Sequence, residues 1–292
     1  MNIFLTGATG YIGGAVADAL MKAGHSVTGL ARSDEAAGKL HLKGVAAHRG
    51  DLSAPASLAE AASALDGVIH TGTTNDGRLD QAAIRTMLDA LHGSGKPFVY
   101  TSGVWVLGNT GDTPADETAR LNPAKLVAWR PAVERMVLES AQKGVRAIVI
   151  RPALVYGRGG GIPADLVKSA RENGAARYVG TGQNRWPVID VDDLADLYLR
   201  AVEGAASGTL LNAADSSAYR VKDIAEAASD GAGKDGRTES WPLEEARKIL
   251  GAYADALVLD QLVSSAKAKS MLGWKPRAAG ILDDLHRGSY VS

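Results

Sequence analysis

The stretch from Thr6 to Gly14 reads TGATGYIGG and decides the fold of this chain. An apolar run at residues 3–5 precedes it, long enough for a buried strand, and apolar residues at helical spacing follow it until Gly24. A glycine-rich turn between a strand and a helix suits a pyrophosphate, because the bare backbone can approach the phosphates and the helix N-terminus offers free N–H groups. The alternative is a glycine-rich turn that binds nothing, and the flanking strand and helix patterns argue against it.

Three glycines have different tasks in this turn. Gly7 permits a tight turn with positive φ, Gly10 lets a pyrophosphate approach the backbone, and Gly13 lets the helix pack closely on the strand. Their spacing is GxxGxxG rather than the commoner GxGxxG. The residues of the turn that we expect to contact a dinucleotide are Gly7, Thr9, Gly10, Tyr11, Ile12 and Gly13.

Composition excludes several classes of site. The 292 residues contain no cysteine, which removes disulfides, thiolate zinc sites and a cysteine nucleophile. The six histidines are scattered without ligand spacing, so we expect no metal site. A net charge of −1 gives no reason to expect nucleic acid or a membrane as partner. A strand pattern from residue 2 leaves no room for a signal peptide, and no apolar run could span a membrane, which predicts a soluble, cytoplasmic protein.

Strand and helix patterns alternate along the first half of the chain. Apolar runs predict strands at residues 3–5, 26–31, 45–48, 68–70, 98–100 and 147–150, with helical patterns between most of them. This rhythm predicts an α/β fold with a parallel sheet covered by helices on both faces. Ligands of such sheets bind beyond the carboxyl ends of the strands, so the residues that follow each strand become candidates for the site.

The second strand ends at Arg32 and Ser33, where the adenosine ribose of a dinucleotide would lie. A cation there favours NADP(H), because it attracts the 2′-phosphate that an acidic residue would repel. The alternative is an ordinary solvated arginine. Asp51 after the third strand either accepts a hydrogen bond from the adenine amino group or satisfies its own turn. The other strand exits expected to contact the dinucleotide are Leu52, Thr71, Gly72, Thr73 and Thr101.

The pattern changes beyond residue 155. The glycine-rich loop GRGGG at residues 157–161 is a plausible boundary, so we assign residues 1–155 to the dinucleotide-binding domain and residues 156–292 mainly to a substrate-binding part. A strand near residues 209–213 is expected to return to the main sheet. Asp192 and Asp193 begin a helical pattern, where they serve either acid–base chemistry or capping, and the position favours capping.

Taken together, the motifs resemble the short-chain dehydrogenase/reductase superfamily, close to its extended branch of epimerases and dehydratases and most like the atypical members of that branch. The resemblance covers nearly the whole chain and rests on TGATGYIGG, Asp51, DGVIH (66–70), VYTS (99–102), RPALVYG (151–157), VDDL (191–194) and LGWKP (272–276). It implies a Rossmann-type doubly wound parallel sheet with a smaller C-terminal substrate-binding part. It also implies NADP(H) along the sheet edge from Arg32 to Ser102, with Pro152 among its contacts, and a small-molecule substrate, and it leaves a homodimer open.

The chain departs from the family at the catalytic pair. The family uses a Tyr as general acid or base, a Lys four residues later and an upstream Ser or Thr. Aligned on Glu134, this chain has Leu126 and Arg130 in place of the pair, and Gly103, next to Ser102, in place of the Ser. Leucine cannot transfer a proton, whereas Arg130 can still bind ribose hydroxyls. Pro131 also makes it open whether Arg130 belongs to the helix or precedes it.

Other side chains remain as candidates for catalysis and substrate binding. The catalytic candidates are Ser102, Tyr156 and Arg130, and Tyr178 and Asp190 are further proton donors in the substrate region. The alternative for each is a structural role, because a buried tyrosine commonly finds a single hydrogen-bond partner. The substrate-binding candidates are Trp105, Tyr178, Arg185 and Trp186, with Trp129 as a further wall of the pocket; core packing is the alternative for the tryptophans.

Two functions therefore remain open. The first is an NADP-dependent oxidoreductase or epimerase-like enzyme that acts on a small carbonyl or hydroxyl substrate without the usual Tyr–Lys pair. The second is a non-catalytic NADP(H)-binding sensor or regulatory protein. Leu126 and Arg130, which replace the family's catalytic pair, favour the sensor, and the pocket-like, tryptophan-rich C-terminal part favours the enzyme.

Overall fold

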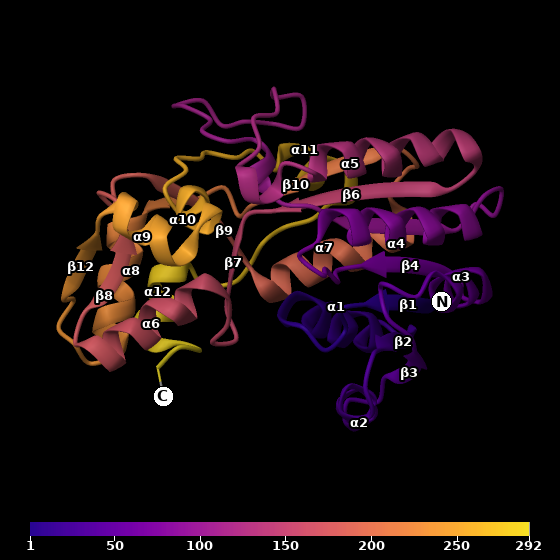
Figure 1. Ribbon diagram of the computed structural model, residues 1–292, viewed down its shortest axis with the longest axis horizontal. Coiled ribbons are helices and arrows are strands. Elements are labelled where there is room, and N and C mark those ends of the chain that lie inside the picture. Colours follow the sequence, from indigo (N-terminus) through magenta and orange to yellow (C-terminus); the bar gives the residue numbers. More distant parts are fainter. Residues whose placement is uncertain (292) are drawn as a thin grey trace.

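Within residues 1–291, which the computed structural model describes, seven strands form one parallel sheet (Figure 1). Its order is β10-β6-β5-β4-β1-β2-β3. The strands are β1 (Asn2–Thr6), β2 (Ser26–Ala31), β3 (Ala46–Arg49), β4 (Gly67–His70), β5 (Pro97–Thr101), β6 (Arg146–Pro152) and β10 (Thr209–Ala213). The order reverses beside β1, which puts the glycine-rich turn at the position where sheets of this kind bind ligands.

Alternation along the strands produces two hydrophobic cores. Ile3 and Leu5 of β1 pack in the core under α1 (Tyr11–Lys22), α2 (Asp34–Leu42) and α7 (Val191–Gly204). Phe4, between them, packs on the opposite face with α3 (Pro55–Ala64), α4 (Gly77–Ala90) and α5 (Arg130–Glu139). Because successive side chains of a strand point to opposite faces, a sheet covered on both sides needs uninterrupted apolar strands. This arrangement confirms the predicted Rossmann-type doubly wound parallel sheet.

The chain returns to the sheet after residue 155. Strand β10 pairs in parallel with β6, in the region where the sequence placed a returning strand. Helix α7 belongs to this return as well, because two parallel neighbours need a crossover connection and α7 covers the face that it crosses. Helix α11 (Ala266–Leu272) lies near α7 and β10. The Rossmann part therefore includes segments that precede and segments that follow the loop GRGGG at residues 157–161.

The remaining segments form a smaller part beside the sheet (Figure 1). Strands β7 (Leu154–Tyr156), β9 (Arg185–Asp190) and β11 (Ala218–Arg220) form one small sheet, and β8 (Ala176–Val179) pairs with β12 (Thr238–Trp241). The helices of this part are α6 (Gly161–Asn173), α8 (Val221–Gly231), α9 (Leu243–Leu250), α10 (Ala252–Leu257) and α12 (Ile281–Arg287). They enclose a hydrophobic core of their own. No helix within residues 1–291 has the length and apolar character needed to cross a membrane.

Candidate active site

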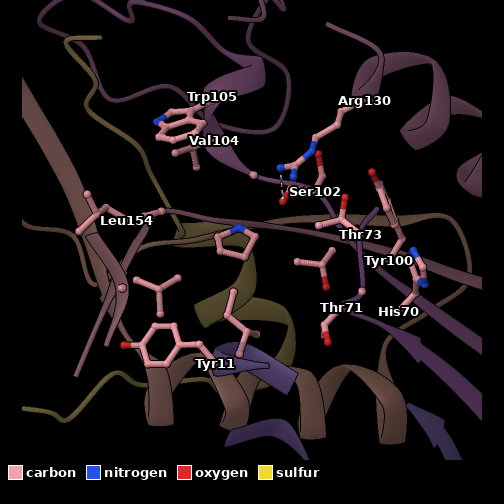
Figure 2. A pocket seen from close by; sticks show the side chains of 18 of the residues that line it. Tyr11, His70, Thr71, Thr73, Tyr100, Ser102, Val104, Trp105, Arg130 and Leu154 are labelled. Carbon is pink, nitrogen blue, oxygen red and sulfur yellow. Dashed lines mark hydrogen bonds between the residues drawn. The ribbon is translucent and has the colours of Figure 1, made fainter. Parts of the chain in front are cut away.

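A pocket of about 330 Å³ opens at the carboxyl ends of the central strands, between the sheet and the smaller part (Figure 2). Strands β4, β5 and β6 and the start of α1 contribute its walls. The residues predicted from the sequence that line it are Tyr11, Ile12, Thr71, Gly72, Thr73, Thr101, Ser102, Trp105, Trp129, Arg130 and Pro152. The strand exits named from the sequence are thus brought together at one edge of the sheet.

The glycine-rich turn has the geometry that a pyrophosphate needs. Gly7 has a φ of 73°, and a Cβ on Gly13 would lie 2.1 Å from the carbonyl oxygen of Gly7. Gly10 is the N-cap of α1 and provides no side chain to cap it. The first turn of α1 therefore keeps its backbone donors for a ligand, and the residues present fit a dinucleotide.

The outer part of the edge, at β2 and β3, is more exposed. Ser33 caps α2, because its hydroxyl accepts a hydrogen bond from the backbone N–H of Ala36 at 3.1 Å. Asp51 accepts from the backbone N–H and hydroxyl of Ser53, at 2.8 and 2.6 Å. These hydrogen bonds lower the pKa of Asp51, and the nearby charge of Arg32 adds to the effect. Asp51 thus fulfils the turn role that the sequence left open, and Arg32 lies exposed beside it.

The predicted dinucleotide contacts that lie outside the pocket are in the glycine-rich turn or at the ends of β2 and β3. They are Gly7, Thr9, Gly10, Gly13, Arg32, Ser33, Asp51 and Leu52.

His70 forms part of the pocket floor and is neutral. The Nδ1 atom of His70 lies 2.7 Å from the hydroxyl of Thr6, and the ring of Tyr100 stacks on the imidazole at a centroid distance of 6.1 Å. Burial lowers the pKa of His70 to about 4. The floor of the pocket therefore carries no positive charge at neutral pH.

The loop after β4 is held by a buried carboxylate. Asp80 is 1% exposed and accepts hydrogen bonds from the hydroxyls of Thr73 and Thr74 and from the backbone N–H of Thr74. The hydroxyl of Thr71 donates to the carbonyl oxygen of Thr6 at 2.7 Å. The hydroxyl groups of these threonines donate their protons within the protein, so each hydroxyl can offer a ligand only its oxygen as an acceptor.

Arg130 begins α5 and extends into the pocket. Its Nη1 atom donates to the carbonyl oxygen of Ser102 at 2.9 Å (Figure 2). Its guanidinium lies 5.6 Å from the centre of the Trp129 ring. A Cβ on Gly103 would lie 2.9 Å from the same nitrogen. An arginine therefore fits here because residue 103 has no side chain.

A buried ion pair fixes α5 against the sheet. Arg151 of β6 donates from Nε to Glu134 of α5 at 2.9 Å, and both side chains are 3% exposed. This pair holds the helix that presents Arg130.

Three polar atoms at the pocket have no hydrogen-bond partner within residues 1–291. They are the hydroxyl oxygens of Tyr100 and Ser102 and the Nε atom of Arg130. Buried polar groups are nearly always paired, so this cluster marks a place for the polar atoms of a ligand. Burial raises the pKa of Tyr100, against the effect of the nearby Arg130 charge, so its hydroxyl stays protonated at neutral pH.

Some residues named from the sequence lie elsewhere. Tyr156 is 1% exposed and outside the pocket wall, because it points into the core of the smaller part and donates to the carbonyl oxygen of Ala279 at 2.7 Å. Asp190 caps α7 by accepting from the backbone N–H of Asp192 at 2.7 Å. Leu126 is 42% exposed and also lies outside the pocket.

The predicted substrate-binding residues divide between two places. Trp105 lines the main pocket, whereas Tyr178 and Trp186 line a second cavity in the smaller part. Arg185 lines neither and binds the carboxylate of Asp260 through two nitrogens, at 2.9 and 2.6 Å.

Among the polar side chains that line the main pocket, sequence reasoning missed His70 and Tyr100. Both end or nearly end a buried strand, and both lie inside the motifs DGVIH (66–70) and VYTS (99–102), which were the signal that could have found them.

Comparison with known proteins shows the family and the fold that this chain shares with them. The family model described as NAD dependent epimerase/dehydratase family matches residues 3–214. An uncharacterised protein of Saccharomyces cerevisiae is 34% identical over 302 residues, with 99% of each chain covered. A 2-alkyl-3-oxoalkanoate reductase of Stenotrophomonas maltophilia is 26% identical over 227 residues, 71% of this chain and 67% of that one. A solved UDP-glucose 4-epimerase from Thermotoga maritima has a TM-score of 0.82 at 19% identity, covers 100% of this chain and 97% of its own, and shows the shared fold.

Proposed function

This chain belongs to the NAD dependent epimerase/dehydratase family, and we propose that it is an NADP(H)-dependent reductase of a small carbonyl compound that works without the usual Tyr–Lys pair. Similarity to a 2-alkyl-3-oxoalkanoate reductase supports a carbonyl substrate. The exposed Arg32 at the end of β2 supports a preference for the 2′-phosphate of NADP(H).

The observation that carries the proposal is the cluster of unpartnered polar atoms on Tyr100, Ser102 and Arg130. A bound nicotinamide would supply the hydride. The glycine-rich turn would hold the pyrophosphate, and Arg130 would bind the nicotinamide ribose or the substrate oxygen. The protonated hydroxyl of Tyr100 would donate a hydrogen bond to the substrate carbonyl oxygen, which becomes more basic during reduction.

A non-catalytic NADP(H) sensor is the second candidate. Leu126 does not line the pocket, and the hydroxyl of Tyr156 donates to the carbonyl oxygen of Ala279, so neither residue can transfer a proton to a substrate there. A protein that binds the dinucleotide without turnover needs only the glycine-rich turn and the sheet edge.

One experiment separates the two functions. Purified protein is titrated with NADPH and NADH by calorimetry and then mixed with NADPH and a panel of aldehydes, ketones, quinones and flavins. A reductase oxidises NADPH with at least one carbonyl compound and binds NADPH more tightly than NADH. Saturable NADPH binding without oxidation across the panel supports the sensor, and no binding of either dinucleotide rejects both functions.

A further inference from the structure

The smaller part contains a second cavity, of about 240 Å³, with aromatic and aliphatic walls. The side chains that dominate it are Tyr178, Val179, Trp186, Trp241, Tyr253 and Leu257. The indole N–H of Trp186 donates to the carbonyl oxygen of Leu257 at 3.1 Å, so it is not available to a ligand. An apolar cavity with aromatic walls suits a hydrocarbon or aryl group.

This cavity adjoins the main pocket. Ile162, near the start of α6, lines both of them. Trp105 of the main pocket makes an edge contact with Tyr253 of the second cavity, with the ring centres 6.0 Å apart. Ile162 and the Trp105–Tyr253 pair therefore form the boundary that the two cavities share.

The cations beside this cavity already have carboxylate partners. Arg177 of β8 binds Glu239 at 3.0 Å and lies over the ring of Trp241 at 5.5 Å. Arg185 of β9 is held by Asp260 at 2.6 Å and also contacts Asp112 at 3.2 Å. Asp165, exposed in the lining, adds a negative charge. A nucleoside diphosphate needs unpaired cations for its phosphates, and this surface would repel it instead.

We propose that the second cavity binds an uncharged apolar tail, alkyl or aryl, on the carbonyl substrate. The inference rests on the proposed reductase function and adds the class of its substrate: an apolar ketone or aldehyde, and not a sugar linked to a nucleoside diphosphate. The reacting carbonyl lies in the main pocket at Tyr100 and Ser102, and the tail passes Ile162.

The test measures binding rather than turnover. The full chain, saturated with NADP⁺, is titrated by calorimetry with methyl ethyl ketone, methyl hexyl ketone, methyl octyl ketone and UDP-glucose. The Kd of the ketones is expected to fall about fourfold for each methylene that enters the cavity, with no binding of UDP-glucose. Equal Kd values for the three ketones, or saturable binding of UDP-glucose that displaces the longest ketone, overturn the inference.

Two neighbouring residues of α9 provide a matched pair of variants. Leu250 lines the cavity, whereas Ile249 is 75% exposed. Leu250→Trp is expected to fill the cavity and abolish the dependence of the ketone Kd on chain length, and Ile249→Trp is expected to behave as wild type. A Leu250→Trp protein that keeps the full dependence contradicts the inference. If this variant does not fold, the wild-type series still decides.

These results can be told apart from a failure of the proposed function. If the protein binds long ketones more tightly but oxidises no NADPH, the apolar cavity is supported and the reductase function is rejected. If the protein reduces ketones of every length equally well and binds them with equal Kd values, the reductase function is supported and the apolar cavity is rejected as a substrate site.

Discussion

At the scale of single residues, the pocket is defined by polar atoms that the protein leaves without partners. The hydroxyl of Tyr100 is the clearest case, because the side chain is 2% exposed and its oxygen has no partner within residues 1–291. Such a group costs stability, and proteins commonly retain that cost at functional sites. Ser102 and Arg130, both named from the sequence, lie beside it.

Removal of the Tyr100 hydroxyl should separate stability from activity. We expect Tyr100→Phe to raise the free energy of unfolding by about 1 kcal/mol, because an unpaired buried hydroxyl disappears. We expect kcat for carbonyl reduction to fall about 100-fold with the Kd of NADPH unchanged. Urea unfolding, steady-state kinetics and calorimetry measure the three quantities. A variant as active as wild type would remove Tyr100 from the chemistry.

Arg32 should determine the choice between the two dinucleotides. In Arg32→Asp we expect the Kd of NADPH to rise at least about tenfold and that of NADH to fall, because a carboxylate repels the 2′-phosphate and can bind the free ribose hydroxyls. Lys39→Asp is the control, since this exposed residue of α2 carries the same charge. Equal NADPH affinity in Arg32→Asp and wild type would rule out the phosphate role.

At the scale of elements, the glycine-rich turn and α1 act as a unit with β4. A Cβ on Gly7 would lie 2.7 Å from the hydroxyl of Thr71, and one on Gly13 would meet the carbonyl of Gly7. The turn therefore packs between its own helix and the loop after β4. A similar fit links α5 to the end of β5, where Arg130 takes the space beside Gly103.

Two adjacent glycines of α1 should respond oppositely to the same substitution. Gly13→Ala places a methyl group 2.1 Å from a backbone oxygen, so we expect a loss of about 2 kcal/mol or more in unfolding free energy and weaker NADPH binding. In Gly14→Ala the nearest atom is the flexible Nζ of Lys43 at 3.4 Å, so we expect a gain of up to about 1 kcal/mol. Urea unfolding and calorimetry compare the two. Equal stability of both variants would contradict this packing.

At the scale of the whole molecule, the two parts share one chain that crosses between them repeatedly. Strand β7 leaves the sheet for the smaller part, α7 and β10 return, and α11 returns again. The candidate active site lies where these crossings bring the strand ends against Trp105 and Ile162. The same arrangement buries His70 under the pocket.

The buried His70 should make the whole fold sensitive to acid. Its pKa is lowered from 6.5 to about 4, so between these values the unfolded chain binds a proton that the folded chain does not. The free energy of unfolding therefore rises with pH across this window. Acidification from pH 6.5 to about pH 4 should lower it by up to about 3 kcal/mol. Urea unfolding across the window measures this slope.

A variant isolates the contribution of His70. Burial raises the pKa values of Asp190 and Asp215, which stabilises the fold on acidification and acts in the opposite direction. His70→Asn removes the histidine and keeps these two carboxyl groups. The free energy of unfolding of this variant should therefore rise less steeply with pH than that of the wild type. An unchanged slope in this variant would assign the acid sensitivity to other groups.

The sequence by itself determined the Rossmann sheet, the glycine-rich turn and the polar strand exits, because continuous apolar runs, helical periodicity and glycine spacing are local properties of the chain. It could not place Tyr156, whose hydroxyl is used by Ala279, a residue 123 positions away. Nor could it show that Arg185 is neutralised by Asp260, or that Tyr100 is left without a partner. Only the tertiary structure decided these points, since whether a polar group is paired depends on segments that meet in space.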